Sequence, residues 1–275
     1  MCARPGVALA LVALLALSPD ALAGRRHSLV PSADGQPGPT AADLLALLDT
    51  LAAADGRVCQ LAVDAVLQGN WPREGTDEES WLQPWVRLSV GTPEVALLGS
   101  RLNAAQACVR RLAATWLGRS ESPQALARLR TALAGPSAEE RQAGALGLGE
   151  RADAGTREVL ERALADSDSG VAATAAWALG ELEDARALPA LEKAAHHAQA
   201  RVRRAAVASL GNLSDGRALS TLVQALQDTD ATVRRAAARA LSESDASPQA
   251  QRALRAALAD TSPDVRREAA QALGR

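Results

Sequence analysis

The sequence of 275 residues contains no tyrosine and no phenylalanine, and tryptophan, at five positions, is its only aromatic residue. A core without phenylalanine or tyrosine has to be filled by alanine, leucine and valine. These residues suit closely packed helices and argue against a β-sandwich. This composition therefore favours an all-α fold.

Signatures of catalysis are also missing. The sequence has no HExxH, GxSxG or CxxC motif and no phosphate-binding glycine loop. Its one histidine pair, His196 and His197, has no further ligands at zinc-binding spacing. We therefore expect no enzyme activity, no catalytic residue, no metal site and no cofactor.

The one long apolar run stands at the start of the chain. Residues 7–17 are uniformly apolar, and after a short break Ala21, Leu22 and Ala23 form a small-x-small cleavage site. This pattern is typical of a secretory signal peptide and is too short to span a bilayer. We expect cleavage after Ala23 and a periplasmic or secreted protein without a membrane span in the mature chain; the alternative is an uncleaved N-terminal anchor. Residues 24–40, rich in proline, glycine and serine, are expected to form a flexible linker.

The dominant positive feature is an internal repeat with a period of about 31 residues. A valine anchors five copies, at Val109, Val171, Val202, Val233 and Val265, and Glu140 takes its place in the remaining one. A leucine follows eight residues after each anchor, at Leu117, Leu148, Leu179, Leu210, Leu241 and Leu273. A fixed period of this length indicates a stacked repeat protein. Such arrays mainly present a binding surface.

Each repeat has the pattern of a helical hairpin. In one copy, Val233 and Leu241 share a helix face, and a second helix is expected over residues 248–259 with Leu254 and Leu258 inward. Glycines that follow the anchor leucines are expected to end the first helices, at Gly118, Gly149, Gly180, Gly211 and Gly274. Aspartates are expected to begin the second helices, at Asp153, Asp184 and Asp215.

This pattern resembles the HEAT-repeat family, in particular the short bacterial HEAT-like, or PBS-lyase-type, repeats. The residues that carry the likeness in the last copy are Asp260, Val265, Arg266, Ala269, Ala270, Leu273 and Gly274. The likeness covers about residues 104–275. It implies a right-handed α-solenoid of about five and a half stacked hairpins, whose Val-Arg-Arg helices line the concave surface. Residues 41–103 would then form a divergent helical N-terminal cap.

The resemblance also implies a structural ladder between an aspartate five residues before the anchor and an arginine one residue after it. Its members would be Asp166, Asp228, Asp260, Arg110, Arg141, Arg203, Arg234 and Arg266. These residues are expected to bridge repeats and to cap helix ends. Two copies depart from the pattern, since His197 replaces the aspartate in one and Ala172 replaces the arginine in another.

A partner site is expected on the concave face. Positions two and six after the anchor point away from the buried face. They place here Trp177, Arg204, Arg235, Arg239, Arg267 and Arg111. Tryptophan and arginine often dominate binding energy at interfaces, so we expect a protein partner with an acidic patch. The alternative is a solvated basic face with Trp177 packed between repeats.

Charge is unevenly distributed along the repeats. Residues 135–199 hold 6 basic and 12 acidic residues, and residues 200–275 hold 12 basic and 8 acidic residues. Such a field can orient a charged partner. The net charge of −2, together with export, argues against nucleic acid as the partner.

Three tryptophans, Trp71, Trp81 and Trp85, lie in residues 69–93, which interrupt the repeat pattern. This insert either closes the open end of the stack or reaches over the concave face as a specificity loop. Residues 40–68, before it, have the pattern of two amphipathic helices, with Leu61 among the apolar positions.

Cys59 and Cys108 are the two cysteines expected in the mature chain. In an oxidising compartment they invite a disulfide, which would join the N-terminal cap to the first repeat. The alternative is two small buried thiols. At the other end, the final apolar helix stripe has no closing second helix, which makes self-association there a further option.

Two classes of function remain. The first is an exported, non-catalytic scaffold that binds a protein partner on the concave face of the solenoid. The second is an enzyme-associated subunit, because the resembled family includes subunits of phycobilin lyases, which attach bilin pigments to proteins.

Overall fold

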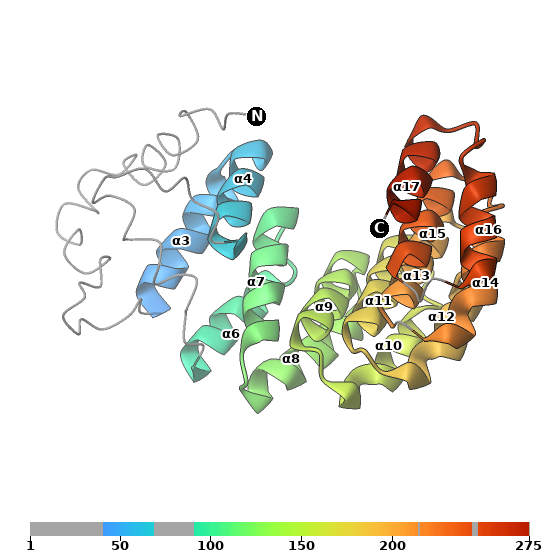
Figure 1. Ribbon diagram of the computed structural model, residues 1–275. Helices are drawn as coiled ribbons and strands as arrows, with labels where there is room; N and C mark the ends of the chain where they lie inside the picture. The colour runs from blue at the N-terminus through green and yellow to red at the C-terminus, as the bar shows by residue number, and fades with distance from the viewer. Residues whose placement is uncertain (1–40, 69–90, 214, 244–246, 275) are drawn as a thin grey trace, which may run out of the picture. The chain divides into compact units, whose positions relative to one another are not determined.

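The computed structural model describes residues 41–68, 91–213, 215–243 and 247–274 (Figure 1). The expected signal peptide, the linker and the tryptophans of the insert, Trp71, Trp81 and Trp85, lie outside these ranges. The described residues form fourteen α-helices and three short 3-10 helices, with no strand among them. Within these ranges, every helix is too short or too polar to cross a membrane. The chain divides into two compact units, residues 1–129 and 130–275.

Unit 1 contains the helices of residues 41–103, which were predicted to form a cap, and the first repeat helix. Its helices are α3 (Ala41–Ala53), α4 (Gly56–Gln68), α6 (Thr92–Arg101) and α7 (Ala107–Arg119), and α8 (Pro123–Leu133) spans the border between the units. α7 packs against α3, α4 and α6. The core of the unit includes the fully buried Leu48, Leu98 and Leu112. The two helices expected before the insert are confirmed, but Leu61 is 48% exposed and does not belong to their apolar face.

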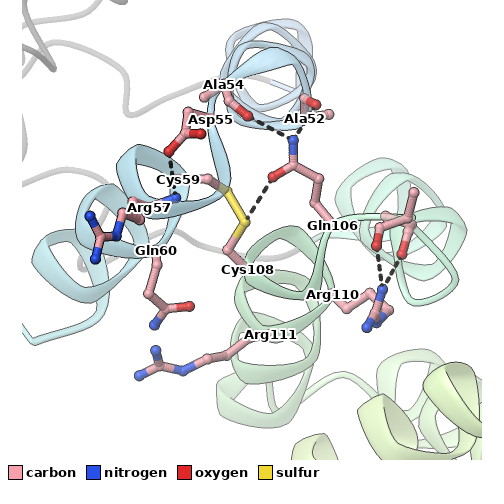
Figure 2. Close-up of a disulfide and its surroundings, with 12 residues drawn as sticks. Ala52, Ala54, Asp55, Arg57, Cys59, Gln60, Gln106, Cys108, Arg110 and Arg111 are labelled. Carbon is pink, nitrogen blue, oxygen red and sulfur yellow. Dashed lines mark hydrogen bonds between the residues drawn. A yellow bond between two sulfur atoms is a disulfide. The ribbon is translucent and has the colours of Figure 1, made fainter.

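A disulfide joins two helices of unit 1. Cys59 of α4 and Cys108 of α7 are bonded, with their Cα atoms 6.0 Å apart, and both side chains are buried (Figure 2). Beside it, the Gln106 carboxamide donates to the carbonyl oxygens of Ala52 and Ala54, at 2.6 and 2.9 Å. The bond therefore joins α4 to α7, the first helix of the repeat series.

Unit 2 consists of helical hairpins in two rows (Figure 1). We call inner helices those that carry the anchor positions: α9 (Ala138–Arg151), α11 (Ser169–Glu181), α13 (Ala200–Asn212), α15 (Ala231–Glu243) and α17 (Pro263–Leu273). The outer helices are α10 (Arg157–Ala163), α12 (Leu188–Ala194), α14 (Leu219–Ala225) and α16 (Pro248–Ala257). Each inner helix packs against the next inner helix in the series. Together with α7 and α8, these helices make five pairs and one single helix, which confirms the expected α-solenoid of about five and a half repeats.

The repeated apolar positions form the core of unit 2. The anchors Val171, Val202, Val233 and Val265 are fully buried, and the anchor leucines of α9 to α15 are at most 2% exposed. Leu254 of the last outer helix is buried as expected. Leu258 is 42% exposed, which corrects its predicted inward position. Leu226, the C-cap of the preceding outer helix α14, is only 5% exposed, and α16 packs against α14. Within the described ranges no further outer helix follows α16 to cover Leu258 in the same way.

Glycines after the anchor leucines have a different role from the expected one. The inner helices α9, α11 and α13 continue one or two residues beyond them, and only Gly274 is a helix C-cap. A Cβ atom on Gly149 would lie 2.9 Å from the Cα of Ala178, and one on Gly180 would lie 3.0 Å from the Cα of Ser209. These glycines therefore allow neighbouring inner helices to approach closely. The aspartates expected to begin the second helices each cap a short 3-10 turn that leads into the outer helix: Asp153, Asp184 and Asp215.

Three arginine–aspartate pairs connect successive repeats of unit 2. In each pair the guanidinium donates two hydrogen bonds of 2.7–2.9 Å to one carboxylate; the pairs are Arg141–Asp166, Arg203–Asp228 and Arg234–Asp260. The arginine always belongs to the earlier repeat and the aspartate to the loop before the next inner helix. Each arginine also donates to two backbone carbonyls of the loop before its own helix. One guanidinium therefore ties its own helix to two successive loops.

The other predicted ladder members have no such pair in the described residues. Arg110 and Arg266 donate to two loop carbonyls each, as Figure 2 shows for Arg110. We call each arginine–aspartate pair of the ladder a rung. In unit 2 a rung is missing between α11 and α13, where Ala172 replaces the arginine and His197 replaces the aspartate. His197 Nδ1 accepts a hydrogen bond from the Gln199 backbone N–H, as the ladder aspartates do from the residue two positions on. The two departures seen in the sequence are thus the two halves of one rung, with the loop cap retained.

The ladder makes the stability of unit 2 depend on pH. Hydrogen bonds from Arg141, Arg203 and Arg234 lower the pKa values of Asp166, Asp228 and Asp260 below the usual aspartate range. A carboxyl whose folded pKa lies below its unfolded value stabilises the fold above the unfolded pKa. That contribution is lost as the pH falls through the folded pKa.

We therefore expect the thermal midpoint of unit 2 to fall as the pH is lowered from about 5 to about 3. Arg203→Met should cost about 2 kcal/mol at neutral pH, because it removes charged hydrogen bonds to Asp228, and it should make the acid dependence shallower. Circular dichroism melts over this range measure both effects. Arg252→Met on the outer helix α16 is the control, because Arg252 is exposed and has no ion pair within the described ranges. Equal pH slopes for the two variants would contradict the role of the ladder.

Restoring the missing rung should stabilise the α11–α13 junction. The double variant Ala172→Arg with His197→Asp reproduces the pair found in the neighbouring repeats. A double-mutant cycle by urea unfolding should give a favourable coupling of about 1–3 kcal/mol between the two changes. Additive effects would show that the loops at this junction do not place the two positions as in the other repeats.

Candidate functional site

A groove with a volume of about 800 Å³ crosses the inner helices of unit 2. No outer helix contributes to its lining. The residues that line it are Leu146, Ala173, Thr174, Trp177, Arg201, Arg204, Ala205, Ala208, Asn212, Thr232, Arg235, Ala236, Arg239, Ala240 and Glu268. Five of these fifteen residues are alanines and four are arginines, and Trp177 is the one aromatic residue among them.

Four of the six residues expected at the partner site line this groove together: Trp177, Arg204, Arg235 and Arg239. The other two do not. The guanidinium of Arg267 bonds to Asp264 of its own helix, and the next residue, Glu268, lines the groove instead. Arg111 lies in unit 1, where it pairs with Asp64 of α4.

Trp177 both packs between helices and faces the groove. One of its ring carbons would be 2.6 Å from a Cβ on Gly149, so the ring lies directly against the backbone of α9. Its indole N–H interacts with the Glu181 carboxylate one turn later. The pKa of Glu181 is raised, first by burial and then by the nearby charges of Glu150 and Glu183. One side of the Trp177 ring thus packs against α9, as one interpretation expected, while the side chain remains half-buried at the groove. Its role in binding a partner stays a prediction.

The tandem arginines of the repeats divide into two roles. In α13, Arg203 is held by Asp228 in the ladder, whereas its neighbour Arg204 lines the groove. In α15, Arg234 and Arg235 divide in the same way. Arg201, Arg204 and Arg235 have no carboxylate partner in the part of the chain that the structure describes. Their positive charges are therefore available to a ligand.

The groove is also lined by residues one position before and three positions after the anchor, which were not among those predicted from the sequence. Arg201 and Thr232 come directly before Val202 and Val233, and Glu268 comes three residues after Val265. A helix turns by about 100° per residue, so these positions lie at about 260° and 300° around the helix axis from the anchor. They are next to the positions two and six residues after the anchor, at about 200° and 240°. A helical wheel that included them would have found the full width of the groove.

The groove offers chemistry suited to binding. Guanidinium groups supply fixed hydrogen-bond forks for carboxylate or phosphate, the indole offers an apolar face, and alanines leave room for a ligand. Among the described residues, no three histidine, cysteine, aspartate or glutamate side chains gather as a metal site would require. Self-association through the C-terminal end stays a prediction.

Comparison with known proteins supports a repeat solenoid. The family model for HEAT repeats matches residues 131–211 and 192–274, and the model for the PBS lyase HEAT-like repeat matches residues 109–135. No curated protein matches the sequence.

Similar solved structures have low sequence identity to this chain. The Escherichia coli protein YibA is 20% identical, with a TM-score of 0.58 over 74% of this chain and 77% of that chain. The complex of CpcE and CpcF of phycocyanin lyase from Nostoc sp. PCC7120 is 23% identical, with a TM-score of 0.49 over 74% and 80%. A designed armadillo repeat protein in complex with the peptide (KR)4 is 20% identical, with a TM-score of 0.47 over 66% and 98%.

The family matches cover more than half of the chain and coincide with the helical pairs and anchor positions described above. The chain therefore belongs to the HEAT-repeat family, with a repeat of the PBS-lyase type among its copies.

Proposed function

We propose that this protein is an exported, non-catalytic scaffold that binds a protein partner in the groove of unit 2. The observation that carries the proposal is the groove itself, in which Arg201, Arg204 and Arg235 have no carboxylate partner among the described residues and lie near a half-buried tryptophan. Arginine and tryptophan contribute most to interfaces when they are anchored and can be desolvated. Trp177 is anchored by its contact with α9.

Export is supported by two independent features. The first 23 residues have the pattern of a cleavable signal peptide, and the disulfide between Cys59 and Cys108 is of a kind that persists in oxidising compartments. Mass spectrometry of the protein recovered from the periplasm or medium should find an N-terminus at Gly24 and no free thiol. Recovery of the uncleaved chain from the membrane fraction would contradict export as a mature protein.

The groove can be tested by crosslinking in cells. A photoreactive amino acid at Ala208, which is exposed in the groove, should capture a specific protein. The same group at Ser220, exposed on the outer helix α14, should not. Arg204→Glu with Arg235→Glu should abolish the capture at Ala208, because the partner would then meet two like charges.

The matched control is Arg252→Glu with Arg255→Glu, which makes the same change in net charge on the exposed surface of α16. This variant should leave the crosslink at Ala208 intact. Capture at Ser220 but not at Ala208, or equal loss in both charge variants, would place the interaction outside the groove.

A second candidate function is favoured by the match to the PBS lyase HEAT-like repeat over residues 109–135. In that case the protein would assist an enzyme that attaches bilin pigments. Incubation of the purified protein with a bilin tests this directly, because a bound pigment would give a visible absorbance band that co-elutes with the protein. A colourless protein would leave the scaffold as the remaining proposal.

A further inference from the structure

The groove changes in character from one end to the other. At the α9–α11 end it is apolar, with Leu146, Ala173 and the indole of Trp177. Across α13 and α15 it is basic and has four arginines: Arg201, Arg204, Arg235 and Arg239. On α17 the lining ends with the carboxylate of Glu268. A ligand that fits this order is apolar at one end and acidic over the next two helices, and it stops before α17.

The repeat sets the spacing that such a ligand must match. Arg204 and Arg235 occupy equivalent positions, two residues after the anchors of adjacent inner helices. Packed helices lie about 8–10 Å apart. A polyproline II chain advances about 3.1 Å per residue and turns once in three residues. Every third side chain of such a chain therefore faces the groove and meets the next inner helix.

We infer that the groove binds an acidic protein segment in an extended, polyproline II-like form. Its side chains would follow the pattern apolar-x-x-acid-x-x-acid: the apolar group lies against Trp177 and Leu146, and the two carboxylates meet Arg204 and Arg235. This inference rests on the proposed function and names the chemistry of the partner. Guanidinium forks that are free of internal carboxylates match carboxylates with paired hydrogen bonds.

The ladder explains why these charges can serve a partner without loss of stability. Arg203 and Arg234 each hold a carboxylate between repeats, at 14% and 13% side-chain exposure. Arg204 and Arg235, next to them, are exposed and unpaired within the described ranges. Substitution of Arg204 or Arg235 therefore changes the groove and leaves the junctions between repeats intact.

The order of apolar, basic and acidic residues along the groove also disfavours a nucleic acid as the ligand. A single strand carries a charge on every nucleotide, so its phosphates would also lie over the apolar end and beside Glu268. Glu181, one helical turn after Trp177, adds a further carboxylate near the apolar end. A segment with carboxylates only over α13 and α15 avoids these contacts.

The test uses fluorescence anisotropy with the mature, disulfide-bonded chain and synthetic labelled peptides. The main probe has leucine at the first position, glutamate at the fourth and seventh, and proline or serine elsewhere. Matched probes carry glutamine for glutamate, place the glutamates at the third and fifth positions, or carry serine for leucine. A twelve-residue thymidine oligonucleotide is the polyanion probe.

We expect the main probe to bind at least tenfold more tightly than the glutamine probe and more tightly than the probe with altered spacing. Arg204→Glu with Arg235→Glu should weaken it at least tenfold, whereas Arg252→Glu with Arg255→Glu should change it less than twofold. Trp177→Ala should weaken the leucine probe but not the serine probe. Circular dichroism of each variant verifies that unit 2 remains folded, and Trp177→Phe, which keeps a ring, should retain most of the binding.

Equal affinity for the glutamate and glutamine probes would overturn the inference, as would oligonucleotide binding that is as tight and equally sensitive to the groove charges. Equal loss in both charge variants would do the same. If the crosslink at Ala208 captures a protein partner while the peptides show no preference for acid, the proposed scaffold function is supported. The inference that its partner is an acidic segment is then wrong. If the crosslink also fails, the proposed function falls with it.

Discussion

The close approach of neighbouring inner helices is the constraint on which the rest of unit 2 depends. It requires residues without bulk at the contact, and Gly149 and Gly180 lie where any Cβ would press on the next helix. With the helices this close, the buried hydroxyl of Ser209 reaches the Ala176 carbonyl, and a ladder arginine reaches the aspartate of the following loop. The same proximity presses the ring of Trp177 against α9 and so fixes one wall of the groove. Packing, ladder and groove are thus consequences of one spacing.

The tandem arginine motif combines stability and recognition in adjacent residues. On a helix, neighbouring side chains diverge by about 100°. One arginine therefore faces the loops at the edge of the stack, and the next faces the groove. Because the motif recurs in α13 and α15, the two roles are repeated at the same spacing, and a row of paired charges runs parallel to a row of free ones.

Much of this was predictable from the sequence. The 31-residue period established the helical pairs, and the helix phase placed Trp177, Arg204, Arg235 and Arg239 on one face, where the structure has them. Two features depended on tertiary contacts that a single repeat does not contain: the role of the glycines and the exposure of Leu258. The pairing of Arg267 with Asp264 lies within one helix, so its three-residue spacing could have indicated it from the sequence. The tryptophan-rich insert lies outside the described residues, so its two interpretations remain predictions.

The junction between α11 and α13 differs physically from its neighbours. It lacks the arginine–aspartate pair, and it is held by the contact of Gly180 with Ser209 and by one buried neutral hydrogen bond. Van der Waals contacts and neutral hydrogen bonds depend little on ionic strength or pH, whereas the ladder pairs on either side depend on the charge of their aspartates. The step from Trp177 to Arg204 crosses this junction. The central step of the groove is therefore held without an ion pair, unlike the steps on either side of it.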